Sequence, residues 1–106
     1  MEESETIARR LIRRLSGLVE DIDLAIKQSN SSATPHLAVM FNEYLKAAPD
    51  VSPTAKAEGI RPFDGTAGDV GAVGAAEALG KLHGLRAQAR RLGQALEEDF
   101  PPTFCG

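Results

Sequence analysis

Apolar residues recur at helical spacing over residues 6–28, the clearest pattern in the chain. With Leu11 at position d of a heptad, every a, d and e position in this stretch is apolar. An apolar face of this width is typical of a helix in a bundle, because a two-stranded coiled coil needs only the a and d positions. The pattern predicts an amphipathic helix that ends at the polar run of residues 29–32, whose short side chains compete for backbone hydrogen bonds.

A second, shorter helical pattern begins at Thr34 and Pro35. Threonine is a common helix cap, and proline fits the first turn because its missing N–H is not needed there. Apolar and aromatic side chains then repeat at helical spacing from Leu37 to Ala48. Since proline removes a helix hydrogen bond, we expect this helix to end before Pro49.

Prolines and glycines interrupt the pattern over residues 49–68, which we predict to be an irregular connection. One part of it has the layout of a short helix, with Ser52 as cap, a proline in the first turn and Gly59 at the end. Ile60 and Phe63 are available to pin the chain that follows to the core. The segment is either a packed irregular arm or mobile.

The last helical pattern begins near Asp69 or Gly71 and continues to about Glu98. Its apolar seam is narrower than that of the first helix and three of its seven residues are alanine, which permits close approach of a neighbouring helix. Each interior glycine weakens the isolated helix by up to about 1 kcal/mol relative to alanine. We therefore expect packing to hold it together. The seam comprises Ala75, Ala78, Leu82, Leu85, Ala89, Leu92 and Leu96.

Together these patterns predict an all-α fold, a small helical bundle in one domain over residues 1–106. It has two long antiparallel helices, one shorter helix that closes one end, and an irregular Pro/Gly-rich connection. The prolines after Asp99 predict an extended tail over residues 99–106. The short helix spans roughly 20 Å against almost 40 Å for the first, so either the arm around residues 60–63 or a second chain must cover the remaining apolar surface.

Composition narrows the class of protein. With 106 residues, 42% hydrophobic and 25% charged, the chain is too apolar to be fully disordered and has no stretch approaching the roughly 20 apolar residues of a membrane span. The acidic start is unlike a secretory signal peptide. A net charge of −3 disfavours a dedicated nucleic-acid binder. The single cysteine, Cys105, excludes an internal disulfide and favours a reducing compartment, so we expect a cytoplasmic protein.

No residue pattern indicates catalysis, and we expect no enzyme activity, cofactor or metal. His36 and His83 have no second His or Cys at ligand spacing. Cys105 stands one residue from the C-terminus, where holding it beside a base is difficult. The glycines of residues 65–71 lack the Gly-Lys-Ser/Thr ending of a phosphate-binding loop and follow no strand.

The leading hypothesis is a noncatalytic helical protein–protein interaction module, an adaptor or assembly subunit that acts by helix packing. Its partner is another protein or a second copy of the chain. The seam of the last helix supplies apolar contact, arginines at its rim suit carboxylates, and two phenylalanines in the tail form a docking motif. The expected partner-binding residues are Leu82, Leu85, Arg86, Ala89, Arg90, Leu92, Phe100 and Phe104.

The alternative is a peripheral binder of anionic surfaces, lipid or nucleic acid, through the basic face of the first helix. That face carries Arg9, Arg10, Arg13 and Arg14, which suit contact with anionic headgroups. A solvated face with intrahelical ion pairs is the simpler explanation of the same arginines. Insertion into a bilayer would also need the apolar face to be free, whereas the bundle uses it.

Overall fold

A computed structural model of the chain describes residues 2–63 and 72–101, and in these ranges it contains helices and no strand. The helices are α1 (Glu2–Lys27), α2 (Thr34–Val51), α3 (Pro53–Glu58) and α4 (Ala72–Asp99), with a short 3₁₀ turn over Ser31–Ala33. The predicted all-α class and small bundle are confirmed. Of the expected extended tail over residues 99–106, Asp99 is the last residue of α4, because the helix continues one residue further than predicted. Residues 102–106 of the tail, and residues 69–71 at the expected start of the last helix, lie outside the described residues.

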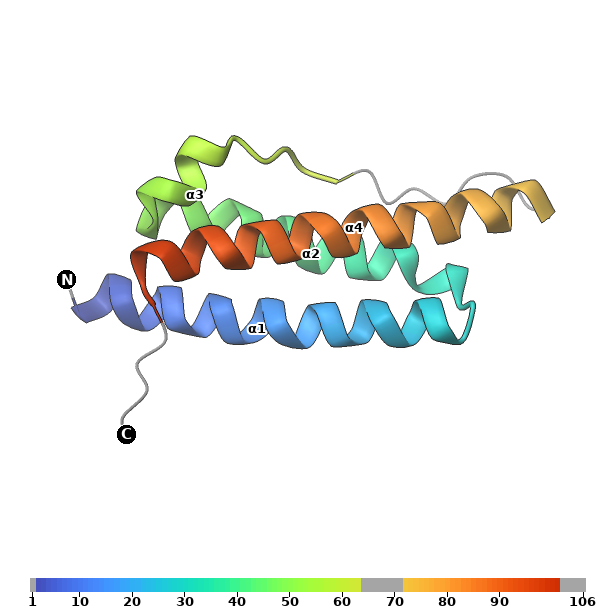
Figure 1. Cartoon of the computed structure of the whole chain (residues 1–106), viewed down its shortest axis with the longest axis horizontal. Helices are drawn as coiled ribbons and strands as arrows, with labels where there is room; N and C mark the ends of the chain where they lie inside the picture. Colours follow the sequence, from blue (N-terminus) through green and yellow to red (C-terminus); the bar gives the residue numbers. More distant parts are fainter. Residues whose placement is uncertain (1, 64–71, 102–106) are drawn as a thin grey trace.

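The two long helices, α1 and α4, run antiparallel, as predicted (Figure 1). In the view of Figure 1, α2 lies behind them and runs antiparallel to α1. The bundle measures 49 × 29 × 17 Å, and because packed helix axes lie about 8–10 Å apart, its shortest dimension holds two layers of helices. No other described helix covers the face of α1 and α4 that points away from α2.

The core follows the heptad pattern of α1. Its a and d positions, from Ala8 to Ala25, are buried, whereas the e positions Ile12, Val19 and Ile26 are only partly buried. Leu24, which falls outside the apolar face, is exposed. The a and d positions therefore build the core, and the e positions form an apolar edge. The buried partners from the other helices are Leu37, Ala38, Phe41, Leu45, Ala48, Ala55, Leu82, Leu85, Ala89, Leu92, Ala95 and Leu96.

Helix α2 is longer than predicted, because it continues through Pro49 to Val51. Proline in the last turn removes only one hydrogen bond, and the Ser52 N–H closes the helix on the Ala48 carbonyl at 2.9 Å. At its start, Thr34 is the first helical residue and not the cap. With 18 residues, α2 spans about 27 Å and packs along both long helices, so the prediction that it closes one end is wrong.

The short helix in the connection is confirmed as α3. Ser52 caps it through its side chain, which accepts a hydrogen bond from the Ala55 N–H, and Gly59 ends it with φ at 61°. Helical residues therefore occupy much of the predicted irregular connection, and its described non-helical residues are Ser52, Gly59 and residues 60–63.

Residues 60–63 form a packed arm. Ile60 and Phe63 lie against the core. The Asn42 side chain holds Phe63 by its backbone, because Nδ2 donates to the Phe63 carbonyl at 2.9 Å and Oδ1 accepts from the Phe63 N–H at 2.7 Å. The packed alternative is confirmed for residues 60–63, whereas residues 64–68 lie outside the described part of the chain.

Candidate functional site

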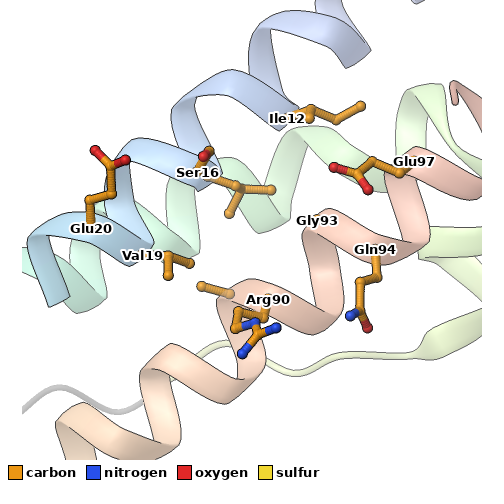
Figure 2. Close-up of a pocket in the computed structure, with 10 residues that line it drawn as sticks. Ile12, Ser16, Val19, Glu20, Arg90, Gly93, Gln94 and Glu97 are labelled. Carbon is orange, nitrogen blue, oxygen red and sulfur yellow. The ribbon is translucent and has the colours of Figure 1, made fainter. Parts of the chain in front are cut away.

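A groove lies between α1 and α4 on the face that points away from α2 (Figure 2). It has a volume of about 310 Å³. Side chains from α1 line one wall and side chains from α4 line the other. The lining residues are Ile12, Leu15, Ser16, Val19 and Glu20 from α1, and Ala89, Arg90, Gly93, Gln94 and Glu97 from α4.

The groove is hollow because α4 presents small residues where α1 presents branched ones. Figure 2 shows Ile12 and Val19 reaching from α1, with the bare backbone of Gly93 on the facing helix. A Cβ atom added at Gly93 would meet nothing within 4 Å. The hollow therefore comes from the missing side chain at an e position of α4, and the partly buried Ile12 and Val19 form its apolar edge.

One ion pair between the two helices serves as a reference for how residues face each other across the groove. Arg86 of α4 donates from Nε to a carboxylate oxygen of Asp23 in α1. Moving seven residues, about two turns, along both helices places Ser16 level with Gly93. The same alignment sets Glu20 level with Arg90 and Ile12 level with Glu97.

Charged residues of both signs stand along the groove. At one end the groove continues into a smaller hollow lined by Arg9, Ile12, Arg13, Glu97 and Phe100, which shares Ile12 and Glu97 with it. Towards the other end, Glu20 and Arg90 line it from opposite walls. The α1 wall therefore changes from positive to negative along the groove, and the α4 wall changes from negative to positive.

The predicted seam of α4 is not on the surface. Leu82, Leu85, Ala89 and Leu92 are at most 1% exposed, because α1 and α2 already cover the apolar face of α4. These four residues are core residues of the folded chain, and the expectation that they present a surface to a partner is corrected. The side chains of Ala75 and Ala78 lie outside the described residues.

The remaining predicted partner-binding residues fall in three places. Arg86 pairs with Asp23 of the same chain. Arg90 is exposed and lines the groove, and Phe100 is half-buried at the groove's end. Phe104 lies outside the described residues. The structure thus brings Arg90 and Phe100 to one groove.

Sequence reasoning missed the residues that shape the groove, Ile12, Val19 and Gly93. The signal was present in two features. The apolar face of the first helix was one position wider than a two-helix contact needs, and the facing e position on the last helix was a glycine.

A second cavity, of about 340 Å³, lies between α2, α3 and the arm. Its walls include Leu45, Pro49, Ala55 and Ile60, and the lysines beside it are exposed. Because Asn42 holds the arm at the side of this open hollow, we interpret it as a depression beside a fixed segment.

A polar cluster joins the end of α4 to the start of α3. Hydrogen bonds from the Ser52 hydroxyl, and from the Thr54 hydroxyl and N–H, lower the pKa of Asp99 below its ordinary value. These bonds engage both carboxylate oxygens, so the cluster acts as a helix cap and offers no free base.

No protein-family model, curated protein or solved structure matches this chain. Within residues 2–63 and 72–101, no three His, Cys, Asp or Glu side chains gather as a metal site would need. Among the same residues, no helix has the length and apolar character to cross a membrane.

Proposed function

We propose that this chain is a noncatalytic helical interaction module, an adaptor or assembly subunit that binds a helical protein surface in the groove between α1 and α4. The supporting observation is the groove itself, which has an apolar edge at Ile12 and Val19 and charged residues of both signs around it. An apolar centre with a polar rim is the usual anatomy of a protein interface.

The hollow at Gly93 suits helix packing in particular. Side chains on one helix form ridges that fit the grooves of another, and a glycine on the receiving helix lets the ridge approach closely. A partner helix would place one side chain over Gly93 and apolar side chains beside Ile12 and Val19. Arg90 and Glu97 would then meet charges of the partner at the edge of the contact.

We also propose that the protein acts in the cytoplasm. The single cysteine, Cys105, supports this proposal, because proteins of oxidising compartments generally use pairs of cysteines.

A photo-crosslinking experiment tests the module. A benzoylphenylalanine at Ser16, which is exposed inside the groove, should give protein adducts in cells that make the chain. The control position is Asp21, which is exposed on α1 and does not line the groove. We expect adducts at Ser16 only, lost in a Gly93→Gln variant that fills the hollow. Equal adducts at both positions, or none at Ser16, would overturn the proposal.

A second candidate function, contact with anionic surfaces, is favoured by one observation. Arg10, Arg13 and Arg14 are exposed and form no ion pair with any described residue, whereas Arg9 pairs with Glu5 at 2.9 Å. Because the a and d positions of α1 are buried, the contact would involve the arginines and the headgroups alone. Arg10 and Arg14 line neither hollow of the groove, so substitutions there separate this function from the first.

Binding to phosphatidylglycerol vesicles tests this candidate. If it is right, the chain binds at about 50 mM salt and releases steeply towards about 200 mM. Replacing both Arg10 and Arg14 with glutamine should weaken binding, and replacing Lys46 and Lys56, exposed residues of α2 and α3, should not. Absent or salt-insensitive binding would dispose of it.

A further inference from the structure

We infer that the occupant of the groove is a second copy of this chain, docked about a two-fold axis that runs along the groove. In this arrangement α1 of each copy lies over α4 of the other. The inference rests on the proposed function and names its partner. Two properties of the groove carry it, the order of its charges and the position of its hollow.

The charge order is self-complementary. A two-fold axis along the groove leaves every residue at its own level and exchanges the two walls. Arg13 of each copy then faces the partner's Glu97, and Glu20 faces the partner's Arg90. Each of these contacts between the copies pairs opposite charges. Along the groove the α1 wall changes from positive to negative, and in the same direction the α4 wall changes from negative to positive.

The hollow at Gly93 favours a two-fold axis along the groove over one that runs across it. A two-fold axis across the groove would also pair opposite charges, but it would set α1 over α1 and Gly93 over the partner's Gly93, which leaves the hollow empty. The axis along the groove instead places Ser16 of one copy over the partner's Gly93, with Ile12 and Val19 about one turn to either side. Ser16 enters the hollow, where an added side chain would meet nothing, and Ile12 and Val19 pack beside it. The arrangement therefore fills both hollows with side chains of α1.

Docking in this way also explains why the e positions of α1 are apolar. Within one chain Ile12 and Val19 are only partly buried, and they would become interior residues of a four-helix layer made by α1 and α4 of both copies. Four-helix packing uses the wide apolar face that the sequence of α1 carries.

Light scattering behind a sizing column tests the second copy directly. At a chain concentration of about 1 mM, where even a weak dimer is populated, the wild-type mass should be twice the 11.3 kDa of one chain. Gly93→Gln should weaken the dimer by roughly ten-fold or more, because it fills the hollow.

The matched control is Gly80→Gln. Gly80 is also a glycine of α4 with nothing within 4 Å of an added Cβ, and it lies about 20 Å along the helix from Gly93. Both substitutions improve helix propensity and should raise the thermal midpoint of the folded chain, so a loss of mass in Gly93→Gln alone cannot come from misfolding.

Two results would overturn the inference. One is a wild-type mass that stays at 11.3 kDa at the highest concentration, and the other is equal weakening by both glutamine variants. Failure of this inference is distinguishable from failure of the proposed function, because groove-specific crosslinks from Ser16 to a different protein would leave the module standing without the second copy.

A charge-exchange experiment tests the axis. Glu20→Arg and Arg90→Glu should each weaken their own dimer, because each places two like-charge pairs between the copies. A mixture of the two variants should regain the dimer mass, because every meeting of positions 20 and 90 in the mixed dimer pairs opposite charges. With the axis across the groove, position 20 would face the partner's Arg13, and mixing would restore nothing. A mixture that remains monomeric therefore overturns the arrangement.

Discussion

Asp99, the last residue of α4, accepts two hydrogen bonds from Thr54 in the first turn of α3, from its N–H at 2.9 Å and from its hydroxyl at 2.7 Å. The Ser52 hydroxyl donates a third bond at 2.6 Å. A carboxylate is unfavourable at the C-terminal end of its own helix but favourable at the N-terminal end of another. Asp99 occupies both places, and its bonds to α3 offset the repulsion from α4.

Replacing this carboxylate should destabilise the fold. Asp99→Ala removes three hydrogen bonds to a charged acceptor and leaves the buried Ser52 hydroxyl without an acceptor for its proton. We expect a loss of about 2–3 kcal/mol in the free energy of unfolding, which lowers the thermal midpoint of a domain of this size by roughly 10 °C or more. Glu98→Ala, at the exposed neighbouring position, is the control. Equal midpoints for the two variants, measured by circular dichroism, would contradict the capping role.

The same residue should make stability depend on pH in the acid range. The bonds from Ser52 first, and then from Thr54, hold the pKa of Asp99 below its ordinary value of 3.8. A folded-state pKa that is lowered stabilises the fold fully above 3.8, and this stabilisation is lost as the pH falls through the folded-state pKa. The difference in unfolding free energy between wild type and Asp99→Asn should therefore be constant near neutral pH and shrink below 3.8. Urea titrations across that range measure it, and a difference that grows in acid would refute the assignment.

The side-chain amide of Asn42 should keep the arm of residues 60–63 closed against the bundle. Asn42→Ala removes both hydrogen bonds to the backbone of Phe63, so the Phe63 amide hydrogen should exchange with solvent faster. The amides of Leu82 and Leu85, deep in α4, should keep their protection, because local opening does not require the bundle to unfold. Hydrogen exchange followed by NMR measures the exchange rates of these amides separately. Unchanged exchange at Phe63 would mean that Ile60 and Phe63 hold the arm through packing alone.

Gln88 offers a stabilising substitution. Its side-chain oxygen is buried and has no hydrogen-bond partner among the described residues. Gln88→Met keeps the length of the side chain and removes the unsatisfied oxygen, so we expect a gain of about 1 kcal/mol in unfolding free energy. The same change at the exposed Gln28 should have little effect. A lower midpoint for Gln88→Met would show that the amide has a partner in solution.

A substitution at Leu85 tests whether the seam of α4 belongs to the core or to a partner interface. Since it is fully buried in the folded chain, Leu85→Asp should unfold the protein and not merely dissociate a complex, because a buried unpaired carboxylate costs several kcal/mol. Far-ultraviolet circular dichroism of the variant provides the measurement. A Leu85→Asp variant that stays folded but no longer binds its partner would show that the seam of α4 is an interface.

These cases show what the sequence can and cannot predict. Local signals sufficed for α3, because Ser52, Pro53 and Gly59 each act on their own neighbours. They failed at Pro49, where a proline rule for helix interiors does not hold in the last turn. The heptad pattern of α4 correctly identified its apolar face. It could not say which element covers that face, because burial of Leu85 depends on helices distant in the chain.

The groove illustrates the same limit. The Asp23–Arg86 pair between its two helices joins residues 63 positions apart, and Asp99 meets its capping partners across 45 and 47 positions. No local pattern reports such pairs. Composition and spacing named Arg90 and Phe100 as candidates, but only the packing of α4 against α1 forms the groove that Arg90 lines and the smaller hollow at its end that Phe100 lines.

The direction in which α1 and α4 run has a consequence for what the protein can carry. The first residues of α1 and the last residues of α4 lie at the same end of the bundle (Figure 1). The two-fold axis that we infer along the groove would keep this end of both copies on the same side, so the two ends of the docked pair would differ. Anything fused to the chain at Glu2 or after Asp99 would be gathered, four attachments together, at a single pole.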